Sequence, residues 1–252
     1  MIERGLWHLG FLSALAVLSG CGDGNGPGSG NFAHDLAPGA SARDFLTGAR
    51  FDRLVVDVRY VAGFRPTDAA LQALGTFLNA RLNKPGGIEV RLGAALQGSG
   101  RASWSLSDIR ALERQHRTVY TSGTTVAAWL VFLDGAYAGG ANVLGIAYHN
   151  TSMAVFSEQI MQHTGGPLEP AQDVVEATVA NHEFGHLLGL VNNGSPMQTE
   201  HQDEPNGEHC DDPDCLMHYS VRLSDFISNL LGGMPQLNQQ CLDDLRSNGG
   251  KG

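Results

Sequence analysis

The stretch NHEFGHLLG, Asn181–Gly189, constrains the fold more than any other part of this chain. It places His182 and His186 four residues apart, with Glu183 beside the first of them. Residues four apart lie on the same face of an α-helix, one turn from each other. The two imidazoles can therefore share one ion if this segment is helical, and the glutamate then lies beside that ion.

The residues before the histidine pair predict such a helix over 171–189. Apolar side chains recur there at spacings of three and four, which is typical of a helix with one buried side. Gly189 follows three residues after His186 and suits the left-handed conformation that ends many helices. We therefore expect the histidine pair near the end of a packed helix.

The rest of the chain alternates between strand-like and helix-like segments. Apolar and β-branched runs predict strands at 53–61, 88–96, 125–135, 142–149 and 152–160. Amphipathic or well-capped segments predict helices at 69–83, 105–116 and 235–247. This order predicts an α/β chain with helices grouped around one mixed five-stranded sheet.

Composition excludes one class of partner. The formal net charge is −10, and the sequence contains no Lys/Arg run with interleaved aromatics. Nucleic-acid binding through a basic surface is therefore not expected. The length of 252 residues suits one globular domain with a tail, and we expect a monomer.

The N-terminus has the pattern of an export signal. Residues 9–18 are apolar and too short to span a bilayer, and they end at Leu18-Ser19-Gly20-Cys21. This run resembles the lipobox of bacterial lipoproteins, which implies a signal peptide at 1–20 and membrane attachment through a lipidated Cys21. An ordinary secretory signal with a chance cysteine is the alternative. Gly22 after the cysteine implies, by the rule for such lipoproteins, an exported cell-envelope protein at the outer membrane or cell surface.

A Gly-rich run, 22–31, follows the cysteine and contains no core-forming residue before its end. Such runs behave as flexible chains. We therefore predict a tether over 21–50 and a folded domain over 51–252.

The histidine pair needs a third ligand if it is to form a catalytic metal site. Three neutral nitrogens and one water make the open tetrahedral arrangement of catalytic zinc, Zn²⁺. Glu183 can then act as the general base that takes a proton from that water.

The eight residues from His182 to Gly189 resemble the first part of the metzincin zinc-peptidase motif, His-Glu-x-x-His-x-x-Gly-x-x-His. The resemblance implies a sharp turn at the glycine and a third histidine three residues later. That position is Asn192, whose neutral amide oxygen is a poor zinc ligand.

A later run, His209-Cys210-Asp211-Asp212-Pro213-Asp214-Cys215-Leu216-Met217, resembles the archaemetzincin continuation of that motif. The resemblance implies that His209 is the third ligand, that 192–208 is an insertion, and that Met217 forms the Met-turn under the metal. The paired cysteines that follow in archaemetzincins are missing, because only Cys241 follows here. His201 is the alternative third ligand, since it lies in the same loop.

Tyr219 follows the methionine by two residues. Met217-His218-Tyr219 resembles the Met-turn of astacins and serralysins, which implies that Tyr219 binds the metal or stabilises the oxyanion. Simple packing is the alternative for this tyrosine.

Cysteine and acidic residues leave further alternatives in this region. An exported protein meets an oxidising compartment, so we expect one disulfide. Cys210–Cys215 is the local pairing, and Cys215–Cys241 and Cys210–Cys241 stay open. The acidic residues could bind calcium, but no EF-hand spacing is present and a solvated loop is favoured; they are Asp203, Glu204, Asp211, Asp212 and Asp214.

The resemblance implies a metzincin-like zincin fold with a twisted sheet, an active-site helix, a Met-turn and a C-terminal helix. It implies a zinc metalloendopeptidase that acts on peptides or proteins, with Ser152–Phe156 as the edge strand above the cleft. An inactive, lipid-anchored binding protein with a structural zinc site is the alternative.

Overall fold

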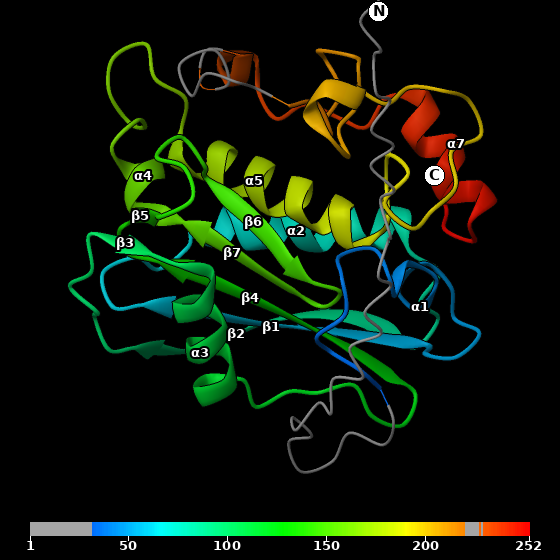
Figure 1. The fold of residues 1–252 in the computed structure, drawn as a ribbon, viewed down its shortest axis with the longest axis horizontal. Helices are drawn as coiled ribbons and strands as arrows, with labels where there is room; N and C mark the ends of the chain where they lie inside the picture. Colours follow the sequence, from blue (N-terminus) through cyan, green and yellow to red (C-terminus); the bar gives the residue numbers. More distant parts are fainter. Residues whose placement is uncertain (1–31, 220–226, 228) are drawn as a thin grey trace, which may run out of the picture.

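A five-stranded sheet forms the centre of the computed structural model, which describes residues 32–219, 227 and 229–252 (Figure 1). The strand order is β2-β1-β4-β7-β6. All neighbours are parallel except β6 and β7, which form an antiparallel pair. The predicted mixed sheet of five strands is confirmed; the strands are β1 Arg53–Val61, β2 Gly87–Leu96, β4 Thr125–Leu133, β6 Gly145–His149 and β7 Ser152–Phe156. β3 Ser103–Trp104 and β5 Ala136–Tyr137 pair separately.

Helices cover both faces of the sheet (Figure 1). On one face, α2 Asp68–Arg81 and α5 Gln172–Leu187 pack on the larger apolar cluster. On the other face, α3 Leu106–His116 packs on a second cluster. β4 contributes side chains to both clusters, since Leu130 belongs to the first and Trp129 and Val131 to the second. This explains why β4 is apolar at almost every position: a strand buried on both faces does not alternate.

The helix boundaries follow from local capping. The Thr67 hydroxyl accepts a hydrogen bond from the Ala70 amide at 3.2 Å and begins α2. Ser105 and Asp108 form a capping box that begins α3. Further helical segments among the described residues are α1 Ala42–Leu46, α4 Ser157–Met161, α7 Gln239–Ser247 and the short 3-10 turns Glu204–Asn206 and Leu230–Gly232.

Two strand predictions are wrong in detail. The strand predicted over 152–160 ends at Phe156, which lies opposite Leu133, the last residue of β4. With no strand left to pair with, the chain turns into α4. The edge strand was expected at Ser152–Phe156, but β7 lies between β4 and β6, so the edge is β6. Both strands of this hairpin are largely apolar, and the sequence did not indicate which would be covered.

Residues 32–50 belong to the folded domain rather than to the tether that the sequence suggested. Phe45 and Leu46 of α1 are fully buried in the larger cluster. The buried Asn150 side chain donates to Ala33 O at 2.9 Å and to Ser41 Oγ at 2.8 Å. Lys84 Nζ donates to three backbone carbonyls of 44–51, each at 2.6 Å. A boundary at residue 51 is therefore wrong for this segment.

The expected signal peptide at 1–20, Cys21 and the Gly-rich run lie outside the described residues. Within 32–219, 227 and 229–252, no helix has the length and apolar character needed to cross a membrane.

Candidate metal centre

The histidine pair lies in the last turns of α5, as its spacing predicted. The helix ends at Leu187, and Gly189 has φ 74°, so the expected left-handed residue after the helix is confirmed. Val191 and Asn192 also have positive φ, at 54° and 61°. A Cβ at Gly189 would lie 2.6 Å from Ser195 N, so only glycine allows this close reversal of the chain.

Three histidines converge where the chain returns. His182, His186 and His209 each offer a ring nitrogen within 4.8 Å of the others, close enough to share one ion. Their ring centroids are 4.9 to 5.2 Å apart. Asn192 is exposed and donates from Nδ2 to Gln202 Oε1 at 3.4 Å. The structure therefore brings together the three histidines that the sequence singled out. Asn192 is not part of this cluster, and the third histidine comes from the far end of the insertion.

Backbone carbonyls fix the orientation of two of these rings. His182 Nδ1 lies 2.7 Å from Leu216 O, and His209 Nδ1 lies 2.8 Å from Asn206 O. A carbonyl oxygen only accepts, so each Nδ1 carries the proton and each Nε2 keeps a free lone pair. A carbonyl that accepts from Nδ1 in this way holds the ring so that Nε2 can bind a metal.

Burial also keeps these imidazoles neutral. It lowers the pKa of His182 to about 4, with His209 nearby adding to the effect. It lowers the pKa of His186 well below the usual value and the pKa of His209 as well. Neutral imidazole is the form that binds a metal ion.

Glu183 is buried between α5 and the edge strand. Its exposed fraction is 7%, and burial raises its pKa to about 8, while a backbone hydrogen bond from Ala147 opposes the shift. A Cβ at Gly145 would lie 2.8 Å from Glu183 Oε1 and 2.6 Å from a Val179 methyl. Glycine at this place in β6 therefore allows the edge strand to approach the helix at the glutamate.

Met217 lies under the histidine-bearing helix, as a Met-turn residue would. Its side chain is fully buried, and a Cβ on Gly185 would overlap its sulfur. The Cys210 amide donates to Met217 O at 2.8 Å, which joins the two ends of the 210–217 segment. The same turn supplies the Leu216 carbonyl that orients His182.

Tyr219 lies at the rim of the centre. Its side chain is 38% exposed, and its ring centroid lies 5.0 Å from that of His209. It is therefore not a core residue, and it faces the same space as the three histidines.

A cavity of about 570 Å³ opens over the histidines. β6 and the residues before it, 142–147, form one wall, and the end of α5 forms another. Ala37 and Pro38 complete it from the N-terminal segment, and His218 and Tyr219 from the Met-turn. Neither the N-terminal contribution nor His218 was foreseen from the sequence, because nothing local in the sequence signals that 32–50 folds back over the sheet.

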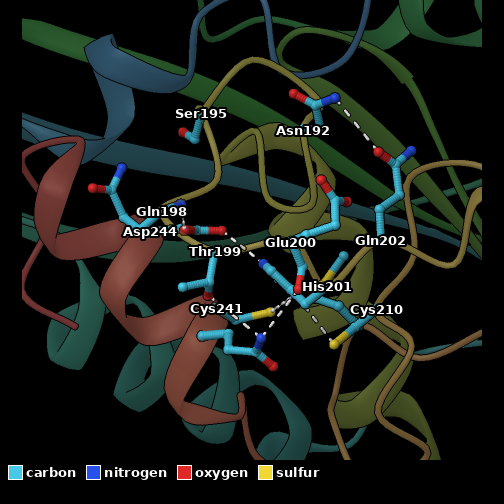
Figure 2. A network of polar contacts seen from close by, with 12 residues as sticks. Asn192, Ser195, Gln198, Thr199, Glu200, His201, Gln202, Cys210, Cys241 and Asp244 are labelled. Atoms are coloured by element: carbon cyan, nitrogen blue, oxygen red, sulfur yellow. Dashed lines mark hydrogen bonds and ion pairs between the residues drawn. The ribbon is translucent and has the colours of Figure 1, made fainter.

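The expected disulfide is wrong, and two alternatives for this region, His201 as the third ligand and a calcium site, are not supported. His201 is not part of the three-histidine cluster; it belongs to a second one with Cys210 and Cys241 (Figure 2). No disulfide forms among the described cysteines, because Cys210, Cys215 and Cys241 are all free. The two ligand clusters found in the described part of the chain contain no carboxylate, so they give the calcium alternative no support.

Comparison with known proteins identifies the fold. No family profile matches the chain, and no curated protein matches its sequence. Among solved structures, it is similar to archaemetzincin from Methanopyrus kandleri, with a TM-score of 0.51 and 17% sequence identity. The match covers 79% of this chain and 97% of the other. The chain therefore has an archaemetzincin-like zincin fold, and the predicted fold class is confirmed.

Proposed function

We propose that this chain is a zinc-dependent endopeptidase whose ion is held by His182, His186 and His209. One observation carries the proposal: three imidazoles reach within 4.8 Å of one another, beside a buried glutamate and under an open cavity. The fold supports it, because this is the fold of archaemetzincin. Three nitrogen donors with room for a further ligand suit catalytic zinc.

The chain's own residues supply the remaining chemistry. When bound, the ion lowers the pKa of a water ligand to about 7 and polarises a substrate carbonyl. Glu183 takes a proton from the attacking water and later passes it to the leaving amine. Tyr219 donates a hydrogen bond from its hydroxyl to the carbonyl oxygen as negative charge develops there.

Peptides and proteins are the substrates that the cleft fits best. β6 is the edge of the sheet and forms one wall of the cavity. An exposed strand edge pairs with an extended peptide through main-chain hydrogen bonds, which accepts many sequences. A strand-lined cleft of this kind suits an endopeptidase, because an extended chain can lie along the strand.

The substitution Glu183→Gln tests the mechanism. Glutamine keeps the shape of the side chain but cannot accept the proton, so cleavage of a fluorogenic peptide should fall by about 10²- to 10⁴-fold. Zinc content should stay at the wild-type value. Full activity in this variant would contradict the mechanism, and zinc binding without any cleavage by the wild-type protein would favour the binding-protein alternative.

We also propose that the protein is a cell-envelope lipoprotein attached through Cys21. The lipobox-like run Leu18-Ser19-Gly20-Cys21 supports this. In bacterial cells that process lipoproteins, labelled fatty acid should be incorporated into the wild-type chain and not into Cys21→Ser. Equal labelling of both chains would exclude this attachment.

A further inference from the structure

β2 forms the edge of the sheet opposite β6, away from the catalytic cavity. Among the described strands it pairs with β1 alone, and the parallel register is unbroken from Gly87 to Leu92. The other side of β2 therefore presents backbone N–H and C=O groups that no described strand uses. A long edge of this kind is able to pair with a further strand.

The larger apolar cluster, which α2 covers, is incompletely buried along this edge. Three side chains of β2 that pack on it are only partly buried: Ile88, Val90 and Leu92. Their partners on β1 are fully buried: Leu54, Val56 and Val58. A groove of about 540 Å³ separates α2 from β2 here, and its lining includes Leu71 and Thr76 of α2 with Ile88 and Val90 of β2. A strand added to β2 would cover these side chains as β2 covers those of β1.

The two charged residues of β2 have opposite signs and lie on the other face of the strand. Arg91 Nε donates to Glu89 Oε1 at 2.9 Å, and the two side chains are 49% and 36% exposed. Charged side chains on an edge usually prevent pairing with a second copy. Opposite charges two residues apart instead attract a strand that carries the same two charges in reverse order.

A second copy of β2 is such a strand. In an antiparallel pair centred on Val90, Glu89 of each copy lies opposite Arg91 of the other, and Ile88 lies opposite Leu92. Centring the pair on Glu89 or on Arg91 would place like charges opposite each other. The Val90 register is therefore the one in which both charges meet an opposite charge and the apolar side chains meet on the α2 face.

We propose that two copies of the chain form a dimer by antiparallel pairing of their β2 strands about a two-fold axis at Val90. The two sheets then form one continuous sheet of ten strands. The same surface serves both copies, as in other isologous interfaces. The catalytic cavity of each copy lies at the opposite edge and stays open. Chain length suggested a monomer, and this proposal replaces that expectation.

A charge exchange tests the register, with molar mass measured by sedimentation velocity on the full chain carrying Cys21→Ser. The parent chain should be a dimer that dissociates on dilution. Glu89→Arg leaves two positive charges on the edge and Arg91→Glu two negative charges, so each variant alone should be monomeric. An equimolar mixture of the two should form a heterodimer, because unlike charges again lie opposite each other. Failure of the mixture to associate would overturn the register.

Cysteine crosslinking locates the axis in the same Cys21→Ser chain. Residues directly opposite in an antiparallel pair have Cβ atoms about 5 Å apart, so Val90→Cys should give a disulfide-linked dimer on mild oxidation. Ala94→Cys is the matched control, since two copies of this residue would lie about 26 Å apart. Equal crosslinking of both variants would contradict an axis at Val90.

The dimer does not depend on the proposed function. Zinc content and peptide cleavage of Glu89→Arg should equal those of the parent chain, because β2 does not line the cavity. A parent chain that stays monomeric at every concentration would overturn the proposal and leave this edge to an extended peptide of another protein. A dimer that persists in both charge variants would also overturn it, because another surface would then join the copies.

Discussion

At the scale of single residues, Tyr219 has two alternative roles: its hydroxyl takes part in catalysis, or its ring serves only in packing. Its partial exposure and its position 5.0 Å from the His209 ring place it in the lining of the cavity above the histidines. Tyr219→Phe removes only the hydroxyl. If it stabilises the oxyanion, kcat should fall by about tenfold to a hundredfold with KM little changed, because the bond is made in the transition state.

Steady-state kinetics on one peptide, together with zinc content, measure this effect. Zinc content should equal that of the wild type. An unchanged kcat would show that the tyrosine serves packing alone.

The site residues differ in how well the sequence predicts them. His182, Glu183 and His186 could be assigned because helical spacing fixes their geometry. His201 and His209 share one polar loop, and no local pattern states which cluster each one joins. The place of His201 is decided by a partner distant in sequence, the Asp244 carboxylate behind its ring. The place of His209 depends on the next residue, Cys210, whose amide donates to Met217 O.

At the scale of elements, α5 packs closely against the Met-turn. Gly185 faces Met217, whose sulfur would overlap an added Cβ. Gly185→Ala should therefore destabilise the fold by about 1–3 kcal/mol, as overpacking does in well-filled cores. It should also disturb the ring positions of the histidines on either side of it in the helix.

Gly75 provides the matched control within α2. A Cβ there would lie 3.7 Å from a Val90 methyl, an ordinary contact. Gly75→Ala should stabilise the fold by about 0.5–1 kcal/mol, because alanine favours helix over glycine. Urea unfolding of both variants measures the difference, and similar free-energy changes would contradict the close packing of α5 on Met217.

Elements differ in how far the sequence predicts them. α5 and the turn at Gly189 follow from periodicity and from the conformational freedom of glycine. The edge position of β6 and the change from β7 to α4 at Phe156 do not, because they depend on which strand lies beside which and where β4 ends. Tertiary packing decides the order of strands in the sheet. Two neighbouring apolar segments therefore do not indicate which of them lies at the edge.

At the scale of the whole molecule, the N-terminal segment links the fold to pH through His34. Its Nε2 accepts a hydrogen bond from the Thr121 amide at 3.3 Å, and Arg117 Nη2 lies 3.1 Å from its Nδ1. Burial and then the Arg117 charge lower the pKa of His34 to about 3. The unfolded chain binds a proton near pH 6.5 while the folded chain does not, so this residue makes stability fall as pH drops from about 6.5 toward about 3.

His34→Gln removes this titration. Urea unfolding at pH 7 and pH 4.5 should show a smaller loss of unfolding free energy for the variant than for the wild type. Other titrating groups are the same in both proteins, so their contribution to the loss of unfolding free energy cancels in the comparison. Equal losses would contradict a buried, neutral His34 in the folded state.

The central claim is that a histidine beyond the insertion, and not the residue three after the glycine turn, completes the catalytic metal centre. The most direct test is zinc content with peptide cleavage, measured for His209→Ala and for its matched control Asn192→Ala. The account predicts that His209→Ala loses one zinc ion and its cleavage activity, while Asn192→Ala keeps both. Retention of zinc and activity by His209→Ala would contradict it.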